Sequence, residues 1–517
     1  MSQPLPPDFD PQQPNTEPSI DQKSENSTMD GGQQAAQGNS NIQNQGNHNW
    51  FGDTWNIIYF GQQEANTERQ AAQPENQQLS PKVTTDSKEN DRHQTSRLSV
   101  ICQNLGVGLL TLLSRHKLYS PLIANVVITL LLLGVRSLGI LEAWELKAYD
   151  QLLRLRPPEL PDQRLLVVTI TEADVKAQDR NENRGSSLSD AALAQLLEKL
   201  EQYKPRVIGL DIYRNFHVGS KYGDLKRRLH QKDNFIAVCQ VGGTDNQQSI
   251  EPPPEVPRDR FGFSDIRRDR DDILRRHLLG LAPGGSSCDT SNAFSLLVAL
   301  RYLEAEKKNI ESKLTSEDYL QIDKVVFKTL ENDSGGYHQL DAKGHQVLLN
   351  YRSSSDVAEQ VTLADVLNGK LTPRLVEDRI VLIGTTDKSF RDYWPTPSDP
   401  EMPGVLVQAH MVSQILSAVL DGRPLIGYWS KWGEAYWIWG WSLVGGLLAW
   451  HLRSRLSLIL VVVTSTGILY VVCFVFLIRG IWVPLIPSAL ALVATGGSVV
   501  VYAALRNNDR NNLDLES

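Results

Sequence analysis

The sequence has few cysteines and lacks the short motifs that mark common enzyme classes. Four cysteines among 517 residues exclude a disulfide-rich scaffold and a structural zinc module. No HExxH, GxSxG or Walker motif occurs, no GxGxxG follows a strand, and the ten histidines are scattered. A net charge of -8, with no clustered basic surface, argues against a nucleic-acid-binding protein. We therefore expect no catalytic residues, no cofactor, no metal and no nucleic-acid partner.

The hydrophobic residues, which make up 41% of the chain, are unevenly distributed. Residues 1–95 are polar and rich in Asn and Gln, and we predict a disordered cytoplasmic region because such a segment buries too little apolar surface to fold. Within it, residues 38–60 end in an aromatic cluster, interpreted as part of a tether, with a docking motif as the alternative. Residues 96–117 predict an amphipathic helix at the membrane surface.

Four long apolar stretches predict four transmembrane helices, at residues 118–140, 435–452, 456–478 and 481–505. Arg453 and Arg455 lie between the second and third stretches, and Arg506 and Arg510 follow the fourth. Because arginine and lysine collect on the cytoplasmic side, both termini, including the tail 506–517, are expected in the cytoplasm. The sequence thus predicts a multi-pass protein of the plasma membrane, embedded in the lipid bilayer.

Residues 141–430 would then lie outside the cytoplasm, where thiols become oxidised. Two of the four cysteines, Cys239 and Cys288, fall in this range. A disulfide between them is one hypothesis. The alternative is two buried thiols, because the stretch IAVCQV around Cys239 resembles a core strand.

The same region predicts an α/β domain. Short apolar runs rich in β-branched residues predict buried strands at RLLVVTI, RVIGLD, FIAVCQV, VLLNY and RIVLIG. Between the first two runs, Ser189 caps a helix that Pro205 ends, which predicts a βαβ unit with a parallel pair of strands. Further helices are expected at 293–304 and 407–420. The predicted fold class is α/β, with a parallel or mixed sheet covered by helices.

Ligands of parallel sheets bind beyond the carboxyl ends of the strands. At this edge the candidate ligand-binding residues are Glu172, Asp174, Asp211, Thr385 and Asp387. They would favour a cation, an amine or a metal-bridged polar ligand, and the loop 171–188 is a candidate lid. The alternative is that these carboxylates cap helices and hold neighbouring loops.

Two further polar segments are candidates for the surroundings of a site. The stretch GFSDIRRDRDDILRR, at 262–276, predicts a self-neutralising turn and the start of a helix. Alternatively, Arg275 and Arg276 contact an anionic ligand or a partner chain. The proline-rich loop 391–405 follows RIVLIG, and such a rigid loop either borders a site or packs across a sheet edge.

Several stretches, in matching order, resemble the CHASE2 family, the extracytoplasmic sensory domains of bacterial signalling proteins. They are LEAWELKAYDQLLRLRP, RLLVVTITEADV, KPRVIGLDIYR, GFSDIRRDRDDILRR, RIVLIGTTDKSFRDYWPTPS and MPGVLVQAHMVSQIL. The resemblance covers 118–505, with one apolar stretch before the domain and three after it. Two departures are GSSLSD near Gly185, where the family often has Trp-Pro, and Gln408-Ala409 where it commonly has His-Ala. Because His410 is shifted by this change, no role is carried over to it.

The resemblance implies a sensory role and leaves the ligand undefined. Family members usually carry a cytoplasmic output module such as a kinase or a cyclase, and we find none in this sequence. We expect a membrane receptor that binds an unknown extracytoplasmic ligand and signals to a cytoplasmic partner protein, with a homo-oligomer as one arrangement. The alternatives are an assembly protein of the cell envelope without a small ligand, and an enzyme that uses Asp211, Glu172 and Asp174.

Overall fold

The computed structural model describes residues 119–178, 187–242, 248–306, 310–352, 356–452 and 454–515. The predictions for the polar region 1–95 and for the amphipathic helix 96–117 lie outside these residues.

The core of the α/β domain is a six-stranded sheet in which every neighbouring pair of strands is parallel. Its order is β10-β1-β11-β2-β3-β4. The strands are β1 Leu165–Ile170, β2 Val207–Asp211, β3 Phe235–Cys239, β4 Phe261–Phe263, β10 Glu359–Thr362 and β11 Ile380–Thr385. Four of the five predicted strands are therefore confirmed as members of this sheet. β1 and β3 are buried along their whole length, as expected for strands covered by helices on both faces.

The predicted βαβ unit needs a correction. β1 and β2 are parallel, but β11 lies between them and pairs with both: Ile380 is in register with Leu165 on one side and with Val207 on the other. The local sequence pattern does not predict this insertion. The strand IVLIGT comes from far along the chain, but it is as apolar as its neighbours and fits the centre of the sheet.

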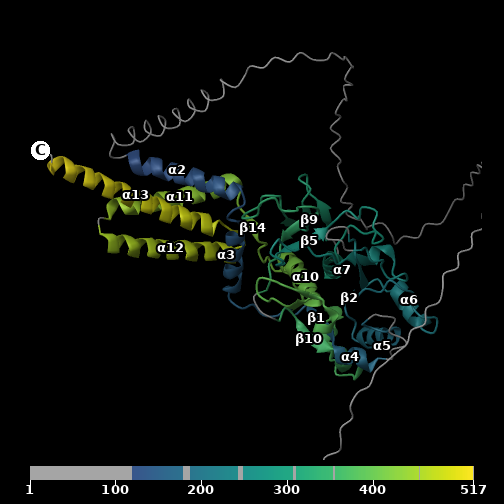
Figure 1. Ribbon diagram of the computed structural model, residues 1–517. Coiled ribbons are helices and arrows are strands. Elements are labelled where there is room, and N and C mark those ends of the chain that lie inside the picture. The colour runs from purple at the N-terminus through teal and green to yellow at the C-terminus, as the bar shows by residue number, and fades with distance from the viewer. Residues whose placement is uncertain are drawn as a thin grey trace, which may run out of the picture. The chain divides into compact units, whose positions relative to one another are not determined.

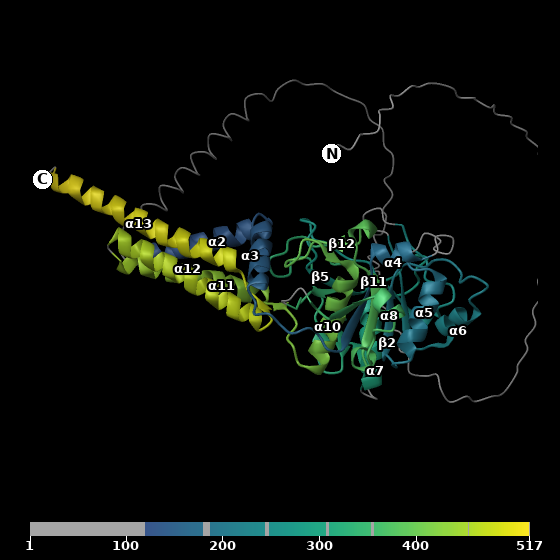
Figure 2. The same cartoon turned by 90° about the horizontal axis from the view of Figure 1, so that it is seen from below.

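Helices cover the two faces of the sheet. The helices α7 and α10 pack together and contact strands on one face, whereas α5 contacts α6 and α8 on the other (Figure 2). The bounds are α4 Glu172–Ala177, α5 Asp190–Glu201, α6 Gly223–Gln231, α7 Phe294–Glu306, α8 Leu363–Leu367, α9 Pro373–Val376 and α10 Gly404–Leu420. The helices predicted at 293–304 and 407–420 are confirmed as α7 and α10. Gly209 in β2 lets α7 approach closely, since a Cβ there would lie 2.8 Å from Phe294 Cζ.

Smaller sheets surround this core. β5 Arg276–Gly280 pairs antiparallel with β9 His345–Leu348. Of the predicted strand VLLNY, only Val347 and Leu348 are therefore in a strand, and this strand lies outside the main sheet. The remaining pairings join β6 Ser312–Leu314, β7 Leu320–Ile322 and β8 Val325–Phe327; β12 Tyr393–Trp394 and β13 Met402–Pro403; and β14 Gly427–Tyr428 and β15 Ile481–Trp482. Two short 3-10 helices are η1 Arg258–Arg260 and η2 Lys388–Phe390.

Four apolar helices form a bundle: α2 Tyr119–Ser137, α11 Lys431–His451, α12 Arg455–Ile478 and α13 Leu485–Leu515 (Figure 1). Leu132, Ile438 and Ala491 make a small core between α2, α11 and α13. Large apolar side chains are exposed on the outside, among them Leu130 at 63% and Val463 at 64%. A surface of this kind is expected where lipid replaces water.

The number of predicted membrane spans also needs a correction. Two helices in the described part of the chain are long and apolar enough to cross a membrane, 456–478 and 485–505. A third crossing is counted if α2 and α3, Glu142–Arg154, which meet at an angle of 89°, form one broken span. α11 is long enough, but its tryptophans, tyrosine and glycines give it a lower mean hydropathy. The count is thus two or three, in place of the predicted four.

Candidate functional site

A pocket of about 440 Å³ lies at the carboxyl ends of β2, β3, β4 and β11, the edge at which the sequence predicts a ligand. Asp211 and Tyr213 come from the end of β2, Asp265 follows β4, and Thr385 ends β11. Such a position is common for ligand sites in α/β proteins because the connecting loops splay apart there.

Three carboxylates line the pocket, and two of them, Asp211 and Asp392, interact electrostatically with one another. Within the described residues, Asp211 has no hydrogen-bond or ion-pair partner, and Asp392 accepts one side-chain hydrogen bond, from Trp394 Nε1 at 2.9 Å. Burial raises the pKa of Asp211 well above its usual range, and the charge of Asp392 raises it further. Burial also raises the pKa of Asp392, partly offset by the Trp394 hydrogen bond. Both effects disfavour the doubly ionised state of this pair.

Asp392 sits against the first residue of α10. A Cβ on Gly404 would lie 2.3 Å from Asp392 Oδ2, so only glycine leaves room for the carboxylate at this helix end. Four residues further along α10, Gln408 also lines the pocket. Gln408 is 4% exposed, and its buried Oε1 atom has no hydrogen-bond partner among the described residues. A buried polar atom in this state costs free energy unless a ligand or water satisfies it.

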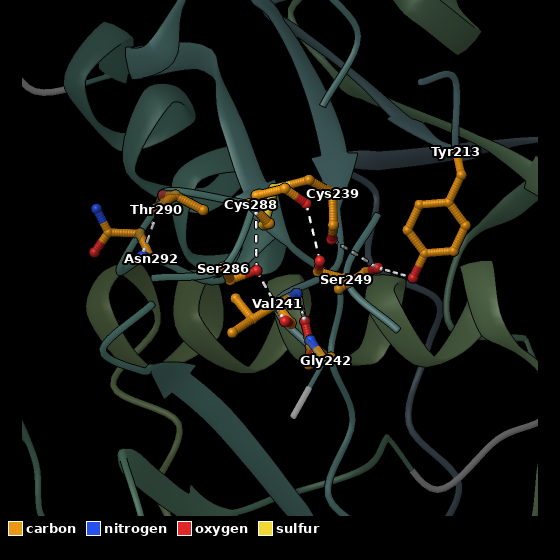
Figure 3. Close-up of a disulfide and its surroundings, with 12 residues drawn as sticks. Tyr213, Cys239, Val241, Gly242, Ser249, Ser286, Cys288, Thr290 and Asn292 are labelled. Carbon is orange, nitrogen blue, oxygen red and sulfur yellow. Dashed lines mark hydrogen bonds between the residues drawn. A yellow bond between two sulfur atoms is a disulfide. The ribbon is translucent and has the colours of Figure 1, made fainter. Parts of the chain in front are cut away.

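A disulfide stabilises the wall of the pocket that the ends of β3 and β4 form. Cys239, the last residue of β3, is bonded to Cys288, which confirms the hypothesis of a Cys239–Cys288 disulfide (Figure 3). Next to Cys288, Ser286 Oγ donates a hydrogen bond to the Val241 carbonyl at 2.8 Å (Figure 3). The amides of Val241 and Gly242 in turn donate to the two carboxylate oxygens of Asp265, at 2.8 and 2.9 Å. The disulfide therefore fixes the loop that orients Asp265.

The hydroxyl of Tyr213 belongs to the same wall. It shares a 2.7 Å hydrogen bond with Ser264 Oγ, and the Ser264 amide donates to the Cys239 carbonyl at 3.0 Å. Tyr213 is thus positioned through the end of β3 as well as through its own strand.

The other predicted residues at the strand ends lie outside the pocket lining. Asp174 forms a capping box with Thr171 and accepts a hydrogen bond from the Ala364 amide at 3.0 Å. Glu172 pairs with Lys176 on the exposed face of α4, and Asp387 caps η2. Capping therefore accounts for Asp174 and Asp387, and an exposed ion pair accounts for Glu172. The segment predicted as a lid contains α4, and its residues 179–186 lie outside the described residues.

Arg275 and Arg276 point into the domain, away from the strand-end pocket. Arg275 is fully buried, and its guanidinium donates five hydrogen bonds to Asp150, Asp269 and Asp271, at 2.7–2.8 Å. Arg276 is also buried and bonds to Asp269 Oδ1 at 2.7 Å. The predicted helix start is absent, since Arg276 opens strand β5. These arginines organise an internal ion-pair network rather than reaching a ligand.

The network connects the domain to the apolar bundle through α3. Asp150, on α3, bonds to Arg275, and Glu145, one turn earlier, bonds to Arg136 of α2 at 2.8 Å. Arg136 also bonds to Glu434 of α11 at 2.7 Å. Between these pairs, Tyr149 of α3 packs on Trp482 of β15, with ring centroids 4.8 Å apart. One helix thus carries contacts to both halves of the protein.

Sequence reasoning missed Asp392, Asp265 and Gln408 as pocket residues. Asp392 lies in the proline-rich loop that was expected to border a site, and Gln408 is the residue at which the sequence departs from the CHASE2 pattern. Nothing in the local pattern marks Asp265, because it lies within a run of alternating charges. Within the described residues, no three His, Cys, Asp or Glu side chains form a group that could hold a metal ion.

Comparison with known proteins identifies the domain. The family model of the CHASE2 domain matches residues 127–447, which is more than half of the chain. No curated protein and no solved structure matches the chain. CHASE2 is a family of sensory extracellular domains, and the matched range runs from α2, through the α/β domain, into α11. On this match, the chain belongs to the CHASE2 domain family.

Proposed function

We propose that this protein is a membrane receptor whose CHASE2 domain binds a ligand in the strand-end pocket outside the cytoplasm. Binding favours one arrangement of the domain, and α3 transmits this change in arrangement to the apolar bundle. The observation that carries the proposal is the double attachment of α3, to the domain through Asp150 and to the bundle through Glu145.

Two features support the orientation of the domain. The Cys239–Cys288 disulfide is typical of an oxidising compartment, so it favours an extracytoplasmic position of the domain. At the opposite end of the bundle, Arg455 precedes the apolar part of α12, and Arg506 and Arg510 follow that of α13. Clustered arginines at this end favour its cytoplasmic position. This orientation requires α11 to cross the bilayer beside α13, against which it packs.

The proposed output is a change at the cytoplasmic end of the bundle that a separate signalling protein reads. The alternative, an assembly protein of the cell envelope, requires no response of the bundle to small molecules.

Hydrogen exchange of the full chain in lipid nanodiscs tests this function. The protein is exposed to a panel of extracytoplasmic metabolites, and exchange is followed at the ends of β2 and β11, in α3 and in α12. We expect a binding compound to protect the strand ends and to change exchange in α3 and α12 together.

A Glu145→Gln variant separates binding from transmission. It weakens the attachment of α3 to the bundle and leaves every pocket residue in place. The strand ends should still be protected by the compound, while the response of α12 is lost. A panel that leaves exchange unchanged everywhere, together with a constant oligomer, would favour the assembly protein instead.

A further inference from the structure

We infer that the ligand of the strand-end pocket is a small organic cation, whose ammonium group lies between Asp211 and Asp392 and donates a hydrogen bond towards Gln408. This inference rests on the proposed receptor function and adds the chemical class of the ligand.

The first argument is the contrast between the half-buried Asp211 and Asp392 and the fully buried carboxylates of the domain. Asp162 pairs with Arg164 and Arg352, Asp190 with Arg214, and Asp269 with Arg275 and Arg276. Within the described residues, Asp211 and Asp392 have no cation within ion-pair distance. Carboxylates that are partly removed from water are ordinarily paired, since an uncompensated charge is unfavourable there. A bound cation would supply the missing charge.

The arginine in the pocket lining does not supply this charge. Arg391 lines the pocket, but it is exposed to solvent and makes no ion pair with Asp211 or Asp392. Its backbone lies in the left-handed region, at φ 58°, where it ends η2. Arg268 lies over the Trp394 ring, with its Cζ 5.7 Å from the ring centroid.

The second argument is the excess of hydrogen-bond acceptors. Among the residues that the structure describes, the Asp211 side chain accepts no hydrogen bond, the Asp392 side chain accepts one, and the buried Gln408 Oε1 accepts none. Gln408 lies on α10 and is independent of the loops that carry the two aspartates. A ligand that satisfies all three must donate several hydrogen bonds, as an ammonium group with its three N–H donors does.

The third argument is size and lining. A volume of about 440 Å³ falls in the range of small-molecule pockets and is far larger than a bare ion requires. Phe390, Trp394 and Ile266 provide apolar surface beside the carboxylates. An organic cation uses both parts of the pocket, the carboxylates for its charge and the apolar side chains for its carbon skeleton. The raised pKa values of Asp211 and Asp392 agree with a pair whose ionised form lacks a compensating positive charge.

Three probes with one carbon skeleton test the inference: 1,4-diaminobutane, butane-1,4-diol and succinate, titrated calorimetrically against the full chain in nanodiscs at pH 7.5. Magnesium chloride serves as the metal control. We expect the diamine to bind, and the diol, succinate and magnesium to bind at least ten-fold more weakly.

Three variants locate the binding. Asp211→Asn and Asp392→Asn remove one charge each and should weaken diamine binding at least ten-fold. Gln408→Leu keeps the side-chain volume and should weaken it several-fold. The matched control is Glu172→Gln, which neutralises an exposed carboxylate at the same sheet edge, outside the pocket, and should leave binding unchanged.

The outcomes separate this inference from the receptor function. Absence of diamine binding, or diamine binding that is equal in wild type and Asp211→Asn, overturns the assignment of a cation. If succinate or the diol binds more tightly than the diamine, and this binding is lost in Gln408→Leu, the assignment of a cationic ligand is overturned. The pocket then remains the ligand site of a receptor. Failure of every probe and of the metabolite panel would overturn both.

Discussion

Arg136 and Glu434 lie 298 residues apart in the sequence, yet their side chains form an ion pair of 2.7 Å. The same guanidinium bonds to Glu145 and donates to the Gly335 carbonyl at 2.7 Å. Arg136 is 11% exposed, and the two glutamates are 2% and 1% exposed. One arginine therefore joins α2, α3 and α11 to a loop of the α/β domain, at the junction where a signal would have to pass.

Replacing Arg136 by methionine should strongly destabilise the junction. The substitution leaves two buried carboxylates without a counter-charge, and breaking a buried ion pair in this way costs about 3–5 kcal/mol. Thermal unfolding of the full chain in detergent, followed by tryptophan fluorescence, should show the loss. The triple variant Arg136→Met, Glu145→Gln, Glu434→Gln should recover most of the stability. An unchanged melting curve for Arg136→Met alone would contradict the junction.

Replacing Asp211 by asparagine should stabilise the ligand-free protein at neutral pH. The pKa of Asp211 is raised in the folded state, so its protonated form contributes stability that is complete below the ordinary value of 3.8 and is lost as pH rises through the folded value. Asparagine does not ionise, so the variant does not lose this stability as pH rises. Unfolding measured between pH 4 and pH 8 should show a smaller decline in stability with rising pH for the variant. A functional residue that costs stability is common in binding sites.

Asp162→Asn is the matched control, and we expect it to have the opposite effect on stability. Arg164, and in second place the Ser413 hydroxyl and Arg352, lower the pKa of Asp162 despite its burial. Its charge therefore contributes stability above pH 3.8, and this contribution is lost as pH falls through the folded value. The asparagine variant should be less stable by about 3 kcal/mol at pH 7, since it leaves both arginines underpaired. Stabilisation by both substitutions would refute the distinction between paired and unpaired carboxylates.

Much of the α/β domain could be predicted from local sequence patterns. Continuous β-branched runs mark β1, β2, β3 and β11, and the cap at Ser189 marks the start of α5. The position of β11 between β1 and β2 could not be predicted, because strand order depends on tertiary packing among equally apolar strands.

The site was predictable only in part. Asp211 and Thr385 follow from the rule that ligands bind at strand ends, and both line the pocket. The same rule selects Glu172, Asp174 and Asp387, which cap or flank short helices, because spacing alone does not separate a capping carboxylate from a pocket carboxylate. Arg275 could not be assigned either, since its partner Asp150 is 125 residues away.

Removing the disulfide should weaken the domain and the pocket together. The double variant Cys239→Ser, Cys288→Ser opens a loop that spans 49 residues, for which the expected cost is about 2–5 kcal/mol. Because the same loop orients Asp265, exchange of the Val241 and Gly242 amides should also increase. Hydrogen exchange of the double variant and of the reduced wild type measures both effects. Wild-type protection of these two amides in the double variant would show that the disulfide does not hold the wall.

The proposed orientation predicts which positions an impermeant maleimide can reach in intact cells. In a background with Cys102 and Cys473 replaced by serine and alanine, Lys226→Cys places a thiol on the exposed face of α6. Ser454→Cys places one between α11 and α12, at the opposite end of the bundle. Lys226→Cys should be labelled in intact cells, and Ser454→Cys only after permeabilisation. The reverse pattern would place the domain in the cytoplasm.

The strand at the middle of the sheet is one of the last parts of the domain to be synthesised. β1 and β2 have no direct pairing and are joined only when β11, some 170 residues after β2, is inserted between them. If the domain is exported, as the proposed orientation requires, the early strands keep unpaired backbone edges until almost the whole domain has emerged, which exposes them to mispairing. Biogenesis of the protein should accordingly depend on a holding chaperone on the side where the domain folds.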